Sequence, residues 1–300
     1  MAHWTDWLIT GVGTVVVLVA LRDIFRTIWQ PSGRGDISHL AMRALWRADR
    51  RRRSRGAAGV RTGPIALALV IALWLVLLIG GGALVYAPHM PESFVLSPGL
   101  DAAERSQVLD AVYLSTVTLA TLGFGDIVPA AGWLRVVVPI QGLIGFALLT
   151  ASVTWVLQVY PALTRRRALA VRLAQLRTVE TSDLLHDPDS SLAAPMLDGL
   201  ASALVQARVD VTQYSETYYF RDRSEEAALP AMLSVASDLC AAGMSAPRTD
   251  VRVAAELLGA AIHDFARVLD EQFLRTGGTT ADILTAYADA HHHGDRGGKV

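Results

Sequence analysis

The sequence predicts an all-α membrane protein with a second, helical domain after its apolar part. Hydrophobic residues make up 52% of the 300 residues and charged residues only 18%, a balance typical of membrane proteins rather than soluble enzymes. Three apolar stretches approach or exceed the roughly 20 residues that a helix needs to cross a bilayer. After residue 161 the sequence is rich in Ala and Leu with helical spacing, and it lacks alternating strand patterns.

Two of the apolar stretches are predicted as core transmembrane helices. One covers residues 64–86 without any charged residue, and the other covers residues 134–160 with a single charge, Arg135, at its edge. A third stretch, residues 7–29 within the N-terminal segment 1–30, is bracketed by tryptophans that suit the two membrane interfaces. Its apolar part ends near residue 21, so spanning the membrane and lying in the interface are both open for it.

Arginine placement predicts the side of the membrane on which each connection lies. Cytoplasmic loops carry an excess of Lys and Arg, so we expect the segment 31–63 and everything after residue 161 to be cytoplasmic. Residues 87–133 then lie outside, and the chain is a multi-pass protein of the plasma or inner membrane. The arginines concerned are Arg34, Arg43, Arg47, Arg50, Arg51, Arg52, Arg53, Arg55 and Arg61 in the connection, and Arg165, Arg166 and Arg167 after the last span.

The connection 31–63 is predicted to contain an amphipathic helix. Residues 31–35 are a turn signal, after which Asp36 or Ser38 can cap a helix. We expect this helix to lie on the inner leaflet, with Arg50–Arg53 in contact with anionic lipid headgroups. A topology signal with a solvated tail is the alternative, and a nucleic-acid partner is not expected so close to a bilayer. The predicted apolar face consists of Ile37, Leu40, Ala41, Ala44, Leu45 and Ala48.

A short helix and a glycine-containing string lie between the two core stretches. Residues 107–120 are apolar with helical spacing, and Ser106 is placed to cap them. This helix is too short to cross a bilayer, so we expect it to re-enter the membrane where protein buries it or water lines it. It leads into the string TLATLGFGD, residues 118–126, in which Gly123 and Gly125 alternate with bulky residues.

This string and its flanking spans resemble the pore of bacterial two-span potassium channels, whose filter usually reads TVGYG. The resemblance covers residues 64–160. Within a pore domain of residues 64–163, it implies a pore helix at 107–120, a filter at 121–126 and an inner helix at 134–160. Glycine is needed at alternate filter positions because it accepts positive φ without a Cβ clash. The implied filter residues are Thr121, Leu122, Gly123, Phe124, Gly125 and Asp126, and the carbonyls of the first four would bind K⁺.

The surroundings of the implied filter depart from the family pattern. Phe124 stands where most members have Tyr, and Leu114 stands where simple members have a Trp bonded to that Tyr. Val117 stands where those members have a Glu bonded to the filter Asp, which leaves Tyr113 as a donor to Asp126. Because the first pair has become apolar on both sides, neither partner is left unsatisfied. We therefore expect Tyr113, Leu114 and Val117 to support a filter that is held mainly by packing, with Leu122 and Phe124 packed behind it.

The same resemblance assigns roles within residues 134–160. Gly145 aligns with the proposed hinge of the family, although close packing against a neighbouring helix is an equal alternative. Val153 and Leu157 would form an apolar constriction that gates by dewetting, unless some of these side chains face lipid. The full set of implied pore-lining residues is Phe146, Leu149, Val153 and Leu157. Arginines at every third position of an apolar helix, the pattern of a voltage sensor, are missing from the sequence.

Residues 164–290 are predicted as a helical cytoplasmic domain. Residues from 164 either continue the preceding helix or start a new one, and further helices are expected at 191–209, 224–242 and 249–275. A disordered tail is expected at 291–300, with metal binding by His291, His292 and His293 as the alternative. The lone Cys240 is expected to be an inert buried thiol. The sequence contains neither a GxGxxG pattern nor a nucleophile–base set, so we expect neither a cofactor nor an enzyme.

The resemblance implies passive, potassium-selective permeation. A closed pore needs four filters and each chain supplies one, so a homotetramer embedded in the bilayer follows. A weakly selective cation channel is the nearest alternative. A membrane-anchored sensor or scaffold, in which the C-terminal domain does the work, is the alternative from another class.

Overall fold

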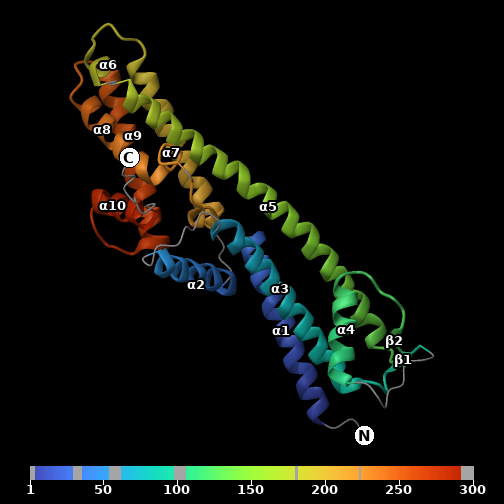
Figure 1. Ribbon diagram of the computed structural model, residues 1–300. Helices are drawn as coiled ribbons and strands as arrows, with labels where there is room; N and C mark the ends of the chain where they lie inside the picture. Colours follow the sequence, from blue (N-terminus) through green and yellow to red (C-terminus); the bar gives the residue numbers. More distant parts are fainter. Residues whose placement is uncertain are drawn as a thin grey trace, which may run out of the picture. The chain divides into compact units, whose positions relative to one another are not determined.

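A computed structural model describes residues 4–29, 36–53, 62–97, 106–179, 182–222 and 224–291. The chain divides into two compact units, Met1–Arg43 with Ala66–Leu157 and Ala44–Ile65 with Gln158–Val300. We call them the membrane unit and the C-terminal unit. Figure 1 shows the elements in chain order, and the described residues are mostly helical.

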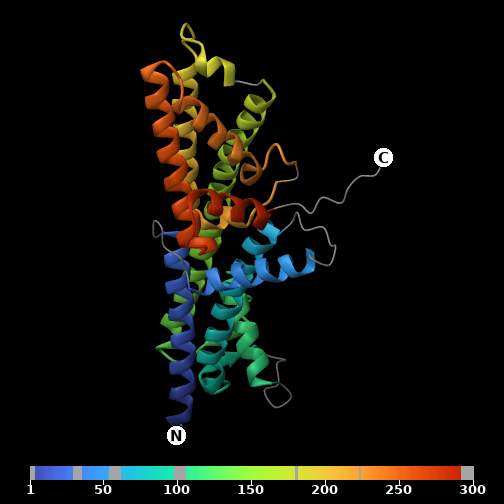
Figure 2. The same cartoon turned by 90° about the vertical axis from the view of Figure 1, so that its left-hand side faces the viewer.

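Three helices in the described part of the chain are long and apolar enough to cross a membrane: α1 (Trp4–Ile28), α3 (Thr62–Tyr86) and α5 (Leu134–Thr178). The predicted class, an all-α membrane protein, is therefore confirmed, and α1 is long and apolar enough to be the predicted extra N-terminal span. α1 and α3 lie side by side (Figures 1 and 2), and an ideal Cβ on Gly13 would lie 2.6 Å from the carbonyl oxygen of Gly81. Small residues thus let these two helices approach closely.

α2 (Asp36–Arg53) begins on a carboxylate that α1 supplies. Asp23, which is only 4% exposed, accepts the backbone N–H of Ile37 at 2.9 Å and that of Ser38 at 3.2 Å, and also the Ser38 hydroxyl. The indole N–H of Trp74 in α3 donates a fourth bond at 2.9 Å. A buried carboxylate needs such partners, and here it takes the place of an N-cap residue. The sequence prediction that Asp36 or Ser38 caps this helix is wrong, because the acceptor comes from another helix.

The buried face of α2 also differs from the predicted one. The buried residues are Ser38, Met42 and Trp46, spaced one turn apart, whereas Leu40 is 65% exposed and Ala44 is exposed as well. Asp23 fixes the first turn of the helix, so this polar contact rather than the apolar periodicity decides its rotation. The side chains of residues 50–53 lie outside the described set, and their contact with headgroups stays a prediction.

α4 (Gln107–Leu119) is the short helix predicted between the core spans. Ser106 occupies the N-cap position with extended backbone, but its side chain makes no capping bond. After α3 a 3₁₀ turn, η1 (Ala87–His89), leads to β1 (Phe94–Leu96), which pairs antiparallel with β2 (Ile127–Pro129). These strands join the segments that precede and follow α4.

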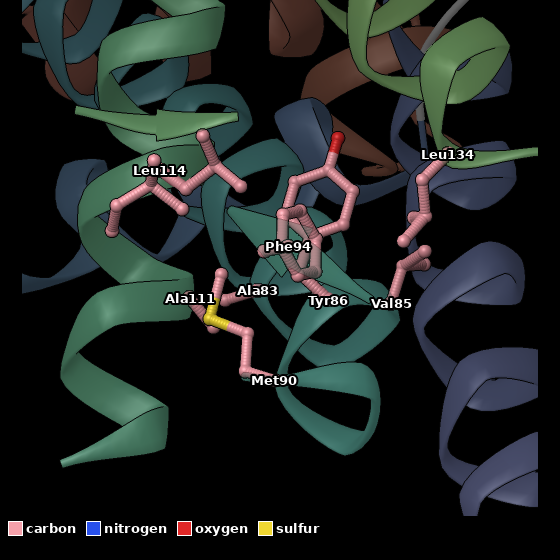
Figure 3. Packing of buried hydrophobic residues seen from close by; sticks show 9 residues of the cluster. Ala83, Val85, Tyr86, Met90, Phe94, Ala111, Leu114 and Leu134 are labelled. Carbon is pink, nitrogen blue, oxygen red and sulfur yellow. The ribbon is translucent and has the colours of Figure 1, made fainter. Parts of the chain in front are cut away.

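A buried apolar cluster joins α3, α4, β1, β2 and the start of α5 (Figure 3). The rings of Tyr86 and Phe94 meet edge to face with centroids 6.2 Å apart. Burial of this cluster fixes α4 against its neighbours. Its members are Ala83, Val85, Tyr86, Met90, Phe94, Ala111, Leu114, Ile127 and Leu134.

α5 is one continuous helix of 45 residues, longer than the predicted 134–160. It continues past Pro161 and through Arg165–Arg167 to Thr178. The alternative that residues after 164 start a new helix is therefore excluded.

The C-terminal unit is helical, as the sequence predicts. α7 packs on α9, and α9 also packs on α8 and α10. The predicted start of the middle helix at 224 is wrong, because α8 begins at Leu229 with a proline in its first turn. Cys240 is buried, which raises the pKa of its thiol, as expected for an inert cysteine. The elements are α6 (Ser182–His186), α7 (Ala193–Gln213), η3 (Ser215–Tyr219), α8 (Leu229–Met244), α9 (Thr249–Leu269), η4 (Asp270–Leu274) and α10 (Thr280–His291).

The three arginines after the predicted span make specific contacts within the C-terminal unit. Arg165 binds the carboxylate of Asp210 through two nitrogens, at 2.8 and 2.7 Å. Arg166 donates to Asp222 at 2.9 Å and to two backbone carbonyls, and Arg167 also pairs with Asp222. Beyond their predicted role as topology signals, these arginines hold α5 to the rest of the unit.

His291 does not belong to a disordered tail. It is the last residue of α10, and it is buried with its ring nitrogens 3.0 Å from the carbonyl oxygen of Tyr287 and 2.7 Å from that of Tyr218. Its ring centroid lies 5.1 Å from that of Trp46. Aromatic packing therefore extends the folded chain to this residue, and residues 292–300 lie outside the described set.

Candidate functional site

The segment after α4 has a backbone of alternating hand. φ is +59° at Thr121, +53° at Gly123 and +79° at Gly125, so every second residue is in the left-handed region. Such alternation turns successive carbonyls toward one side, whereas a β-strand points them to opposite sides. The sequence assigned positive φ to the two glycines but missed Thr121, since a β-branched residue rarely adopts it.

The N-terminal end of this segment is hydrogen-bonded to the last turn of α4. The carbonyl oxygen of Val117 accepts the backbone N–H of Leu122 at 2.8 Å and that of Gly123 at 3.3 Å. The N–H of Thr121 bonds to the carbonyl of Thr118 at 2.9 Å. Any displacement of the end of α4 would therefore move residues 121–123 with it.

The C-terminal end of the segment is held by a side-chain hydrogen bond and by a backbone contact beside the strands. The hydroxyl of Tyr113 donates to Asp126 Oδ2 at 2.7 Å, which is the bond that the sequence led us to expect. The carbonyl of Asp126 accepts the N–H of Ser97 at 2.9 Å, next to the β1–β2 pair. Leu114 and Val117 are both buried in α4. Apolar packing and a hydrogen bond thus act together around this segment.

A buried chain of hydrogen bonds connects α4 to α3 and α5, and sequence reasoning missed it. The hydroxyl of Tyr86 donates to Gln141 Oε1 at 2.5 Å, and Gln141 Nε2 donates to Ser115 Oγ at 2.7 Å. The Ser115 hydroxyl donates in turn to the carbonyl of Ile79 at 2.8 Å. We call this chain the Tyr86–Gln141–Ser115 relay. The one sequence signal was a glutamine inside an apolar span, because polar residues there usually face protein.

The comparison with known families fits this geometry. Residues 72–160 match a family model described as "Ion channel", and the match contains most of α3, all of α4 and more than half of α5. The chain contains an ion-channel domain. The match confirms the resemblance of this part of the chain to a channel pore, and it points to a protein that is not an enzyme.

A similar protein supports the membrane location. The chain is 29% identical over 166 residues to the "Uncharacterized membrane protein YdjJ" of Bacillus subtilis (strain 168). The aligned part is 55% of this chain and 48% of that relative, so the chain spans about half the length of the relative it matches. No solved structure matches the chain.

Glycines set the closest approaches within the ion-channel domain. An ideal Cβ on Gly145 would lie 1.9 Å from the carbonyl oxygen of Leu119, the last residue of α4. The predicted alternative of close packing therefore describes Gly145, and α5 runs unbroken through this position. On Gly82, a Cβ would lie 2.4 Å from Gln141 Nε2. Gly145 thus lets α5 approach the end of α4, and Gly82 lets α3 approach the relay.

Several apolar side chains that the sequence assigned to the filter and pore are exposed in the single chain. Leu122 and Phe124 are 59% and 66% exposed among the described residues, so their predicted packing behind a filter is not seen there and stays a prediction. The α5 residues assigned to the pore are similarly exposed, and pore lining and lipid contact both remain predictions for them. They are Phe146, Leu149, Val153 and Leu157.

Proposed function

We propose that the chain is one subunit of a homotetrameric channel that conducts K⁺ selectively and passively. The alternating hand at residues 121, 123 and 125, located inside an ion-channel domain, carries this proposal. The carbonyls of residues 121–124 and the Thr121 hydroxyl would replace the water shell of a dehydrated K⁺. In this role the partial negative charge at the C-terminal end of α4 would favour a cation in the central cavity of the assembled channel.

Exposed apolar surface supports the assembly of four subunits. A single chain leaves Leu122, Phe124 and Phe146 uncovered, and burial of such surface is a driving force for association. Each chain supplies one filter segment, so a closed pore requires several chains arranged with cyclic symmetry around one axis. Neighbouring subunits would then cover Leu122 and Phe124 behind the filter.

The arginine distribution supports an orientation with the C-terminal unit and α2 in the cytoplasm. In that orientation Arg50–Arg53 would meet the anionic headgroups of the inner leaflet. Vesicle binding with and without anionic lipid, compared between the native chain and one with these arginines replaced by glutamine, tests this contact.

Permeation is tested by reversal potentials of the purified protein in liposomes under opposed K⁺ and Na⁺ gradients. We expect K⁺ selectivity, and we expect Gly123→Ala to abolish conduction, because φ at this residue is +53° and alanine disfavours that conformation. Gly80→Ala is the matched control, since an added Cβ there meets nothing within 4 Å.

The outcomes separate the competing functions. Equal K⁺ and Na⁺ permeability of the native protein would favour a weakly selective cation channel. A phenotype that survives Gly123→Ala in an intact tetramer would favour a sensor or scaffold.

A further inference from the structure

The Tyr86–Gln141–Ser115 relay is a chain of three buried hydrogen bonds inside an apolar domain. Tyr86, Ser115 and Gln141 are 1%, 0% and 8% exposed. Each hydroxyl and the amide carbonyl is used, and the chain ends on a backbone carbonyl of α3. Buried polar groups with all partners present rigidify their surroundings, whereas a partly satisfied network is costly.

The direction of the relay is fixed by its two ends. Ile79 offers only a carbonyl oxygen, so Ser115 must donate to it and must accept from Gln141. The amide of Gln141 must then present its oxygen to Tyr86. A flipped amide would leave the carbonyl of Ile79 without the Ser115 proton, so only the observed arrangement keeps all three hydrogen bonds.

Gly82 makes room for the relay. It lies on the same face of α3 as Ile79 and Tyr86, three residues after the first and four before the second. A Cβ there would lie 2.4 Å from Gln141 Nε2 and 2.5 Å from Ser115 Oγ. The relay thus occupies the place where α3, α4 and α5 come together.

The relay acts on α4 close to the residues that hold the 121–126 segment. Ser115 precedes Val117 by two residues, and the Val117 carbonyl accepts the N–H groups of Leu122 and Gly123. A rotation or shift of α4 at Ser115 would therefore be passed directly to the segment proposed as the filter.

We propose that Tyr86, Gln141 and Ser115 are positioning residues that set the ion-coordinating geometry of the filter through α4. This inference rests on the proposed function of residues 121–126. It assigns a bracing role to polar side chains behind α4, where the sequence predicted support mainly by packing. These residues would not contact the permeant ion. They would act by fixing the position of α4, to which the proposed filter is hydrogen-bonded.

The test compares reversal potentials and the decay of steady currents in liposomes between the native protein, Tyr86→Phe and Gln141→Leu. We expect Gln141→Leu to lower the K⁺/Na⁺ permeability ratio, or to speed current decay, about tenfold. A tenfold change is what the free-energy cost of leaving a buried polar group without its partner corresponds to. Tyr86→Phe removes only one oxygen, so it keeps the test possible where Gln141→Leu fails to assemble. Ser152→Ala is the matched control in α5, because its buried hydroxyl has no hydrogen-bond partner among the described residues.

A merely structural role is distinguished by comparing permeation with assembly. Variants that melt at lower temperature but keep the native permeability ratio and decay rate would overturn the inference. Tyr86→Phe and Ser115→Ala act on the same amide, so their combined effect on the ratio should be less than the sum. A native protein without K⁺ selectivity would refute the proposed function. The relay would then be judged on decay rates alone, where equal rates in native protein and variants would refute it as well.

Discussion

Replacing Gly145 with alanine tests whether this position is a hinge or a packing contact. The added Cβ would lie 1.9 Å from the carbonyl oxygen of Leu119, while ordinary van der Waals contact begins at 3.4 Å. The end of α4 and the facing part of α5 would have to separate by about 1.5 Å, the difference between these two distances. The obstructing atom belongs to the backbone, so no side-chain rotation relieves the clash.

The expected cost follows from this geometry. Overpacking a well-packed interior typically costs about 1–3 kcal/mol, and a clash with a fixed backbone atom belongs at the upper end of this range. Leu119 is two residues before Thr121, so the separation would also displace the 121–126 segment. We therefore expect both a loss of stability and a loss of selective conduction.

The assay combines thermal unfolding of the purified protein with reversal potentials in liposomes. We expect Gly145→Ala to lower the melting temperature by roughly 5 °C or more. Gly142→Ala is the matched control three residues earlier in α5, because its added Cβ would meet its nearest neighbour, the carbonyl oxygen of Thr118, at 3.6 Å. That variant should keep the native melting temperature and permeability ratio.

A Gly145→Ala protein with native melting temperature and native selectivity, but a reduced open probability, would show that the glycine serves bending rather than packing.

Two further predictions concern the C-terminal unit. Burial lowers the pKa of His291 from its ordinary 6.5 to about 4, so the unfolded chain binds more protons between these values and stability rises with pH across that window. His291→Phe should remove up to about 3 kcal/mol of this pH dependence, and melting curves of the full chain with an unchanged pH slope would contradict the assignment. Asp222→Asn leaves the buried Arg166 without its charged partner and should cost about 3–5 kcal/mol in thermal or urea unfolding. The same change at Asp250, in a more exposed pair, should cost much less because solvent screens that pair, and equal losses at both sites would contradict the argument.

Local patterns made the spans and the short helix predictable from the sequence. The predicted helix 64–86 is observed as Thr62–Tyr86, and the predicted 107–120 is observed as Gln107–Leu119. Hydrophobic length and helical spacing are properties of consecutive residues, so they survive without knowledge of the tertiary fold. The positive φ of Gly123 and Gly125 was predictable on another ground, because the resemblance to a channel filter requires glycine at alternate positions.

Contacts between helices were not predictable in the same way. Gln141 bonds to Ser115, 26 residues earlier, and Tyr86 bonds to Gln141 across 55 residues. Such pairs depend on how each helix is rotated about its axis, which hydropathy does not specify. The rotation of α2 shows the same effect, because a carboxylate on α1 set it against the apolar pattern.

The position of Asp23 has a consequence for exchanging parts between related channels. The residues that match the ion-channel family include Trp74 but not the carboxylate that accepts its indole proton. A chimera that receives residues 72–160 without α1 would carry an unpaired buried donor. A chimera that keeps α1 but receives α3 from another channel would leave the buried carboxylate of Asp23 without the hydrogen bond from Trp74. The first helix and the channel domain are therefore best exchanged as a single piece, with the crossover placed after α5 rather than between α2 and α3.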